Sequence, residues 1–279
     1  MELHFPIAFK KMSGTGNDFV VIDNREELVP AAYHSEFTRR VCRRKFSIGA
    51  DGVIFIRDSD KAEFGWDFYN ADGSIAEMCG NGARCAARFA CIEGITDKKT
   101  SFETLAGIIE AETGETGDIV KLKMTRPEDF RLELSVKLDG VEYPVTYVNS
   151  GVPHAVIFVD RDDVPVKKWG RKVRFHQLFE PDGANVNFIR EIGPNKIKVR
   201  TYERGVEDET MACGTGAVAS AIYGGLLKGM ESPVEVETSG GDLLTIYFEL
   251  YDGPVVDNVY LEGPARVIYT GNITAEALL

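Results

Sequence analysis

The sequence CGNGA at residues 79–83 returns as CGTGA at residues 213–217, in the second half of the chain. In each copy a cysteine and two glycines precede a run of small residues that predicts a helix. The first N–H groups of a helix have no partner inside it, and the helix dipole makes this end positive. Each copy therefore predicts a thiol at a helix N-terminus, where a thiolate and a bound anion are both favoured. Two such thiols could remove a proton from one face of a carbon and return one to the other, which is racemase or epimerase chemistry.

Composition and charge restrict the class of protein. The chain has 279 residues, 44% of them hydrophobic, which is enough for one large domain or two ordinary ones. Its net charge of −12 argues against nucleic acid or an anionic membrane as a partner. No apolar stretch approaches the ~20 residues of a membrane span, and we expect no secretory signal at the start. The five cysteines form no regular framework, so we expect a reducing, cytoplasmic location.

Apolar runs separated by turn signals predict short strands on both sides of each cysteine. The expected strands lie near 7–12, 18–23, 52–56, 64–70, 108–109, 119–120, 132–134, 145–148, 155–159, 185–190, 196–203 and 265–269. Helices are expected near 33–45, 83–93 and 217–228. The last of these carries no charge before Lys228, so we expect it to be buried on every side.

The repeated pattern predicts two related halves. We expect an α/β (α+β) fold of two pseudo-symmetric halves, each a mostly antiparallel curved sheet around a central buried helix, with the active site in the cleft between them. The first half is predicted to comprise residues 1–125 plus 265–279, and the second residues 126–264. Tyr69-Asn70 and Tyr202-Glu203 precede the two cysteines at a similar distance, which supports a duplication.

Simpler interpretations of the same residues remain open. The repeated cysteines could be small buried residues in tight turns. Cys42, Cys85 and Cys91 are interpreted as core or incidental residues, and no cysteine spacing fits a zinc site, so no metal is expected. Residues 13–18 lack the third glycine of a dinucleotide-binding loop, and no P-loop occurs. The basic residues within 39–45 are interpreted as a solvated helix face.

Seven motifs follow one another along the chain. They are KMSGTGNDF (11–19), IGADG (48–52), FYNADGS (68–74), MCGNGAR (78–84), GVPH (151–154), NVNF (185–188) and YERGVEDET (202–210). Together they resemble the diaminopimelate epimerase family, whose members convert L,L-diaminopimelate to the meso form in lysine biosynthesis without a cofactor. The resemblance implies an isomerase with two pseudo-symmetric halves that needs no cofactor, binds diaminopimelate as a small-molecule substrate and forms a homodimer.

The resemblance also implies roles for individual residues. Cys79 and Cys213 would be the acid–base pair, one a thiolate and the other a thiol, with the roles exchanged in the reverse direction. Backbone N–H groups after each cysteine would hold the α-carboxylate, polar residues beside the cysteines would orient the amine or assist proton transfer, and others would hold the distal end of the substrate. The residues implied are Gly80, Asn81, Gly214 and Thr215 for the carboxylate, His154 and Glu203 beside the cysteines, and Asn17, Asn70, Asn185 and Arg204 at the distal end.

The chain departs from the family pattern in three places. Val152 stands where many members have asparagine, so that contact is absent or supplied by Asn149. Gly52 stands where some members have glutamine, and Ser47 where glycine is frequent. The nearest alternative function is another cofactor-independent racemase of the same fold, such as a proline racemase-like enzyme. A non-catalytic amino-acid-binding module is the alternative from another class. Which cysteine is the thiolate is left open by the sequence.

Overall fold

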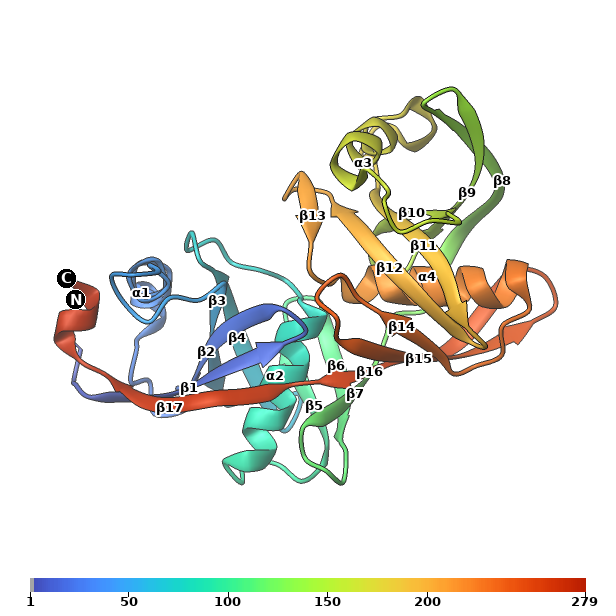
Figure 1. Cartoon of the computed structure of the whole chain (residues 1–279). Helices are drawn as coiled ribbons and strands as arrows, with labels where there is room; N and C mark the ends of the chain where they lie inside the picture. The colour runs from blue at the N-terminus through green and yellow to red at the C-terminus, as the bar shows by residue number, and fades with distance from the viewer. Residues whose placement is uncertain (1–2) are drawn as a thin grey trace. The chain divides into compact units, whose positions relative to one another are not determined.

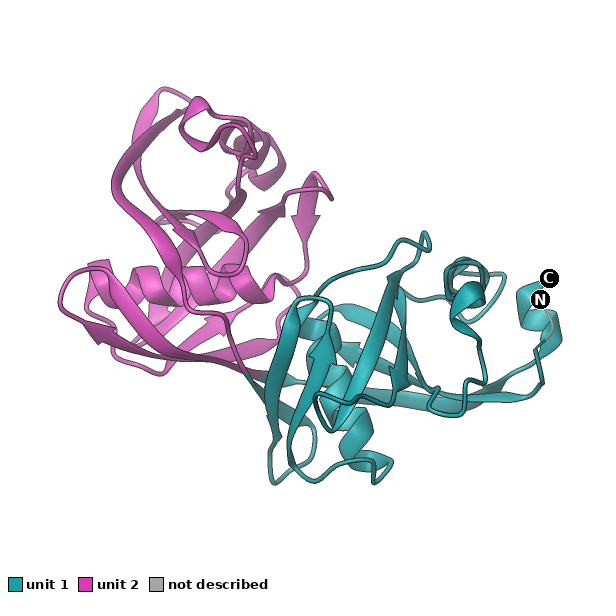
Figure 2. Ribbon diagram, turned by 180° about the vertical axis from the view of Figure 1, so that it is seen from behind, with its two compact units in different colours: residues 1–122, 263–279 teal, residues 123–262 magenta. Residues whose placement is uncertain are grey.

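The structure is a computed structural model that describes residues 3–279. The chain divides into two compact units: residues 1–122 with 263–279 form unit 1, and residues 123–262 form unit 2 (Figure 2). Each unit combines one sheet region with a long helix and shorter helical segments (Figure 1). The predicted mixed α/β fold is therefore confirmed. No helix within the described residues is long and apolar enough to cross a membrane.

Unit 1 is built on strands whose neighbours are mostly antiparallel. Its elements are β1 (Ile7–Gly14), β2 (Asn17–Asp23), α1 (His34–Val41), β3 (Gly52–Arg57), β4 (Phe64–Asn70), α2 (Gly80–Ile92), β5 (Lys99–Thr104), β6 (Gly107–Thr113), β7 (Ile119–Lys123) and β17 (Arg266–Ile273). Short 3₁₀ turns cover Ala31–Tyr33 and Ala275–Leu278. The pairing order is β17-β1-β2-β3-β4-β5-β6-β7. Only β2–β3 and β4–β5 are parallel among these pairs, and α1 and α2 form the two crossovers.

Unit 2 repeats this plan. Its elements are β8 (Glu128–Leu138), β9 (Val141–Asn149), β10 (Pro153–Phe158), α3 (Val166–Arg174), β11 (Asn185–Gly193), β12 (Lys196–Glu203), β13 (Asp208–Thr210), α4 (Gly214–Lys228), β14 (Val234–Glu237), β15 (Leu243–Tyr251) and β16 (Val255–Pro264), with a 3₁₀ turn at Gln177–Phe179. The pairing order is β8-β9-β10-β11-β12-β14-β15-β16, and β13 also pairs with β12. The parallel pairs are β10–β11 and β12–β14, with α3 and α4 as their crossovers.

The strand registers align the two units residue by residue. In unit 1 Val53 pairs with Val20 on one side and Tyr69 on the other. In unit 2 Val186 pairs in the same way with Ala155 and Tyr202. One position toward the N-terminus of β2 and β10, Phe19 therefore corresponds to His154. One position beyond the two tyrosines, Asn70 corresponds to Glu203. The predicted pseudo-symmetry of the halves is thus visible at the level of single residues.

The long helix of each unit lies in its core. Four alanines of α2, at positions 83, 86, 87 and 90, are fully buried, and α4 is buried from Gly216 to Gly225 against β10, β14 and β15 (Figure 1). The expectation that α4 is buried on every side is wrong for its last turn, where Leu227 is 44% exposed. Both helices begin three residues before the predicted starts, at Gly80 and Gly214. Glycine has a low helix propensity and conceals a helix start in the sequence.

The short helices differ more from the predictions. Helix α1 covers only His34–Val41 of the predicted 33–45, and α3 was not predicted because its apolar residues are few and widely spaced. In α3 the buried side chains are Val166, Trp169 and Val173, which recur at helical spacing. Cys42 and Cys85 are buried, as expected, and burial raises the pKa of both thiols to about 12.

A close contact between α3 and β12 gives a stability test for unit 2. A Cβ at Gly170 would lie 2.3 Å from the Cβ of the fully buried Tyr202. We expect Gly170→Ala to lower the free energy of unfolding by about 1–3 kcal/mol, because overpacking outweighs the gain of up to about 1 kcal/mol in helix propensity. Chemical denaturation measures this. The control is Gly193→Ala, where the new Cβ would meet only the Lys196 Cβ at 3.7 Å. Equal stability of the two variants would contradict the contact.

Candidate active site

Cys79 is the N-cap residue of α2. Its backbone is extended (φ −148°, ψ 115°), and its Sγ accepts a hydrogen bond from the Gly82 N–H at 3.5 Å. This N–H is one of the donors that a helix start leaves without a carbonyl partner. The cysteine is partly exposed. Its sulfur therefore lies at the positive end of α2, an environment that favours a thiolate.

A buried polar cluster supports the first turn of α2. Asn81 is 4% exposed, and its Nδ2 donates to Asn17 Oδ1 at 2.7 Å. Its Oδ1 accepts from Thr15 Oγ1 and from Arg84 Nη2, both at 2.9 Å. Arg84 is fully buried and also donates to Thr15 Oγ1 at 2.8 Å and to the Gly80 carbonyl at 3.3 Å. Asn17 and Asn81 are among the site residues predicted from the sequence, whereas Thr15 and Arg84 are not. An arginine in a helix of small residues was the one available signal, since buried arginines require such partners.

Residues 13–17 form the β1–β2 hairpin turn rather than a nucleotide-binding loop. Thr15 and Gly16 both have positive φ, 49° and 92°, as a type I′ hairpin turn requires. A Cβ at Gly14 would lie 2.7 Å from the Asn81 carbonyl oxygen. Glycine at this position therefore lets the end of β1 lie directly against the first turn of α2.

Asn17 also connects to a charged cluster. Its Nδ2 donates to Asp51 Oδ2 at 3.1 Å. The guanidinium of Arg44 bonds to Asp51 Oδ1 at 2.9 Å and to Asp18 Oδ1 at 2.5 Å. Helix α1 ends at Val41, so the expectation that Arg44 lies on a helix face is wrong, whereas the expectation that it is solvated is confirmed by its 59% exposed side chain. Arg44 instead ties together two acidic residues, one of which holds the Asn17 amide.

Asn70 lies at the end of β4 and takes part in a turn. Its Nδ2 donates to Ser74 Oγ at 3.1 Å, and its backbone N–H bonds to the Ser74 carbonyl at 2.9 Å. Gly73, with φ 81°, closes this turn. Among the contacts of residues 3–279, none joins Asn70 to the cluster around Asn81.

Cys213 occupies the equivalent N-cap position of α4. Its backbone is again extended (φ −130°, ψ 112°), and its Sγ lies 3.5 Å from Thr215 Oγ1. His154, at the start of β10, places Nε2 at 2.9 Å from the same Thr215 oxygen. Unit 2 thus brings together three residues that the sequence analysis had assigned to the site.

His154 is held from its other side by residues that the sequence analysis did not assign to the site. Asn187 Nδ2 donates to His154 Nδ1 at 2.9 Å, and Thr201 Oγ1 donates to Asn187 Oδ1 at 2.9 Å. Burial lowers the pKa of His154 to about 3, and the positive charge of Arg204 acts in the same direction. The ring is therefore neutral at physiological pH. The NVNF motif contained the signal, because alternation along a strand puts Asn185 and Asn187 on one face.

Asn185 and Arg204 are in direct contact. Asn185 Oδ1 accepts the Arg204 backbone N–H at 2.8 Å, and Asn185 Nδ2 donates to the Pro153 carbonyl at 3.1 Å. The Arg204 side chain donates only weakly, to the Asp182 carbonyl at 3.4 Å. In the described part of the chain no carboxylate lies within ion-pair distance of this guanidinium. Asn185 therefore fixes the backbone from which Arg204 extends, and the guanidinium keeps most of its hydrogen-bonding capacity.

Glu203 lies between these groups in sequence, at the end of β12. It is partly buried, and burial raises the pKa of its carboxyl group. Asn149, considered as a substitute for the asparagine absent at Val152, accepts the Gly151 N–H on Oδ1 at 3.1 Å. Its oxygen is therefore engaged in the turn before β10.

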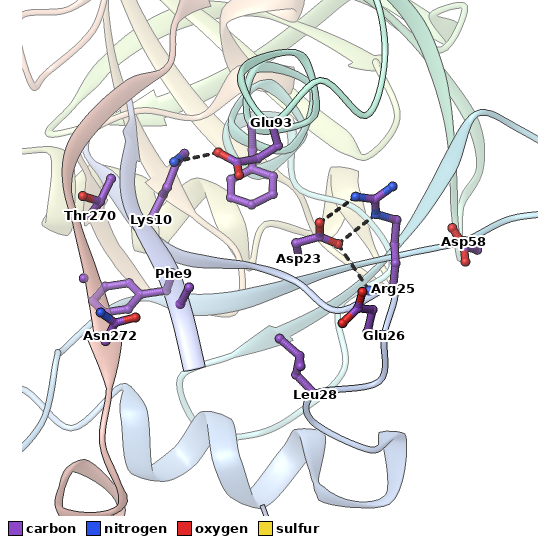
Figure 3. A pocket seen from close by; sticks show the side chains of 13 residues that line it. Phe9, Lys10, Asp23, Arg25, Glu26, Leu28, Asp58, Glu93, Thr270 and Asn272 are labelled. Atoms are coloured by element: carbon purple, nitrogen blue, oxygen red, sulfur yellow. Dashed lines mark hydrogen bonds and ion pairs between the residues drawn. The ribbon is translucent and has the colours of Figure 1, made fainter. Parts of the chain in front are cut away.

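A hollow of about 810 Å³ in unit 1 is lined by none of the candidate site residues (Figure 3). It is lined by parts of β1, β2 and β17 and by Phe89 and Glu93 toward the far end of α2, about 14 and 20 Å from the helix start at 1.5 Å per residue. Four of its charged residues form two ion pairs, Lys10 with Glu93 and Asp23 with Arg25, each at 2.7 Å. This hollow is not the Cys79 site.

Comparison with known proteins agrees with both the motifs and the fold. The family model for diaminopimelate epimerase matches residues 9–129 and 146–268. A diaminopimelate epimerase of Aquifex aeolicus is 46% identical over 98% of this chain and 99% of its own length. One of Archaeoglobus fulgidus is 43% identical over 95% of each chain.

Solved structures of lower similarity share the fold alone. A Bacillus anthracis phenazine biosynthesis protein of the PhzF family has a TM-score of 0.74 at 14% identity, covering 97% of this chain and 100% of its own. A hydroxyproline epimerase of Agrobacterium vitis has a TM-score of 0.68 at 14% identity, covering 99% and 94%. The family model spans both cysteine motifs and most of the chain, and so this protein belongs to the diaminopimelate epimerase family, whose members are isomerases.

Proposed function

We propose that this enzyme interconverts L,L- and meso-diaminopimelate in lysine biosynthesis, with Cys79 and Cys213 as its acid–base pair. The observation that carries the proposal is the equivalence of the two N-caps. Each unit places one partly exposed thiol at the first turn of its central helix, between equivalent strands. An epimerase that uses no cofactor needs two such groups, one for each face of the α-carbon. Family membership supports diaminopimelate as the substrate.

In the proposed reaction a thiolate takes the α-proton, and the thiol of the other cysteine gives a proton to the opposite face. The electron pair left by the α-proton spreads into the α-carboxylate. The N–H groups of Gly80 and Asn81 and those of Gly214 and Thr215 belong to helix starts, where unpaired donors are available. Donors fixed in place before reaction stabilise the added negative charge without reorganisation. Each helix start thus favours both the thiolate and the carbanionic intermediate, through different N–H groups.

Two residues are proposed to bind charged groups of diaminopimelate. The Arg204 guanidinium, which has only a weak carbonyl partner, can bind the distal carboxylate in bidentate fashion. The Glu203 carboxylate can accept hydrogen bonds from a substrate ammonium group. A proline racemase-like enzyme has no distal carboxylate to bind, so Arg204 favours the diaminopimelate reaction.

Deuterium exchange tests the two-thiol mechanism. Incubated in heavy water, the parent enzyme should epimerise L,L-diaminopimelate and place deuterium at the α-carbon, while proline and lysine should not exchange. Cys79→Ala and Cys213→Ala should each lose epimerisation by at least about a thousandfold, because one face lacks its acid or base. The remaining thiol can still remove and return a proton on its own face. Each variant should therefore exchange the α-proton for deuterium in only one of the two stereoisomers, L,L- or meso-diaminopimelate. The stereoisomer that exchanges should differ between the two variants.

The matched control for this test is Cys91→Ala, which removes a partly exposed cysteine elsewhere on α2 and should leave epimerisation unchanged. Epimerisation at the parent rate by either Cys79→Ala or Cys213→Ala would refute the mechanism. Exchange with proline alone would favour the proline racemase-like alternative. Exchange with no substrate would favour a binding module.

The raised pKa of Glu203 predicts a pH-dependent stability. A buried carboxyl that holds its proton more tightly when folded contributes its full stability below the unfolded pKa, near 4.5, and loses it as pH rises through the folded pKa. Glu203→Gln removes this ionisation. The variant should therefore gain in unfolding free energy relative to the parent as pH rises from about 4.5 toward 8. Urea denaturation across this range measures the difference, and a difference that stays constant with pH would contradict the burial of this carboxyl.

A further inference from the structure

The two helix starts are equivalent, but the residues behind them differ in chemistry. In unit 2, Asn187 lies opposite Thr201 on the neighbouring strand and opposite Val156 on the other side, and His154 is two positions before Val156. All three polar side chains lie on the face toward α4 and are at most 2% exposed. Burying polar groups costs free energy unless every one is hydrogen-bonded. A fold that requires only packing here would fill these positions with apolar residues.

Unit 1 does fill them with apolar residues. By the same registers, His154, Asn187 and Thr201 correspond to Phe19, Ile54 and Phe68. These three are also buried, and the rings of Phe19 and Phe68 pack edge to face at 5.7 Å. The apolar set serves the fold of one unit, so the polar set of the other is not needed for the fold.

The hydrogen bonds of the polar set run in one direction. Thr201 donates to Asn187 Oδ1, and Asn187 Nδ2 donates to His154 Nδ1. Since the ring is neutral and Nδ1 is an acceptor, its proton is on Nε2. Nε2–H donates to Thr215 Oγ1, and the Thr215 hydroxyl can donate its own proton to Cys213 Sγ, which lies at 3.5 Å and as a thiolate could only accept.

The orientation of the Asn187 amide follows from its surroundings. A Cβ at Gly216 would lie 2.5 Å from Asn187 Oδ1 and 3.3 Å from His154 Cε1. Gly216 therefore lets the first turn of α4 lie against both side chains. The positive end of the helix favours the amide oxygen, rather than its NH₂ group, at this point. With the oxygen facing α4, the NH₂ group is the one that faces His154.

We propose that Asn187 and Thr201 are positioning residues that hold His154 as its neutral Nε2–H tautomer, so that the hydrogen-bond chain ends on the sulfur of Cys213 and stabilises its thiolate. The proposal rests on the proposed function for its catalytic meaning. A hydrogen bond to a thiolate favours the charged form over the thiol. Phe19, Ile54 and Phe68 of unit 1 cannot form such a hydrogen-bond chain. Cys79 and Cys213 therefore have different surroundings, although both are cysteines at a helix N-cap.

The tautomer is tested by nitrogen NMR of the full-length parent enzyme labelled with ¹⁵N in histidine. His154 should show a protonated Nε2 and an unprotonated Nδ1 near neutral pH. Asn187→Asp offers Nδ1 only acceptors and should move a proton onto it. Thr201→Val removes the donor that orients the Asn187 amide, so this variant should show a mixture of His154 tautomers. Thr201→Ser keeps the hydroxyl and should show the parent tautomer. A parent ring protonated on Nδ1, or an Asn187→Asp ring that keeps Nδ1 unprotonated, would overturn the proposal.

The end of the chain is tested by the rate at which iodoacetamide alkylates each cysteine at pH 7, followed by mass spectrometry of peptides. Thr215→Val removes the last donor and should slow alkylation of Cys213 about tenfold, since the rate follows the thiolate fraction. Thr215→Ser should keep the parent rate, and Cys79 in the same protein is the internal control. An unchanged Cys213 rate, or equal slowing at both cysteines, would overturn the proposal. Neither measurement uses a substrate, so failure here is separate from failure of the exchange experiment.

Discussion

The unpaired N–H groups at the starts of α2 and α4 are the constraint on which the rest of each unit depends. Two parallel strands need a crossover connection. Helix α2 connects β4 to β5 in unit 1, helix α4 connects β12 to β14 in unit 2, and each helix runs through the core of its unit. Burying that helix requires small residues along it, and approaching its first turn closely requires glycine at Gly14 and Gly216. A cysteine at each N-cap then meets the donors that the helix cannot satisfy itself. Fold and candidate chemistry thus share one local geometry.

The side chains that lie behind the helix start differ between the two units. Behind α2, the Asn81 amide and the buried Arg84 share Thr15 as a partner, so a full positive charge is held against the first turn of the helix that Cys79 caps. Behind α4, the neutral His154 and its amide partner stand where unit 1 has Phe19 and Ile54. A buried arginine acts through its charge over a distance, whereas a hydrogen-bond chain acts only on the atom at its end. The duplicated scaffold therefore carries two distinct electrostatic environments.

The sequence was informative wherever the pattern was local. Turn signals and apolar runs located most strands of both units, and the repeated cysteine phrase located both helix starts to within a few residues. It was silent wherever the pattern was long-range. Thr15 and Arg84 lie far apart in the chain and meet only because the β1–β2 hairpin lies against α2. Thr201 reads as an ordinary strand residue until β12 is paired with β11. Helix α3 was missed because three apolar contacts were too few to reveal its period.

A duplicated fold alone does not suffice for the proposed reaction. Inversion needs one thiolate and one thiol at the same moment, and two identical thiols in identical surroundings would have equal affinity for the single proton they share. Half of the molecules would then have the protonation state that reacts only with the other stereoisomer. Residues that differ between the units remove this equality without disturbing the helix starts, since Phe19 and His154 occupy the same register position. Reversibility limits how large the difference can be, because the enzyme must visit both protonation states in every full cycle. A hydrogen-bond chain that ends on a neutral hydroxyl biases the equilibrium by a modest factor.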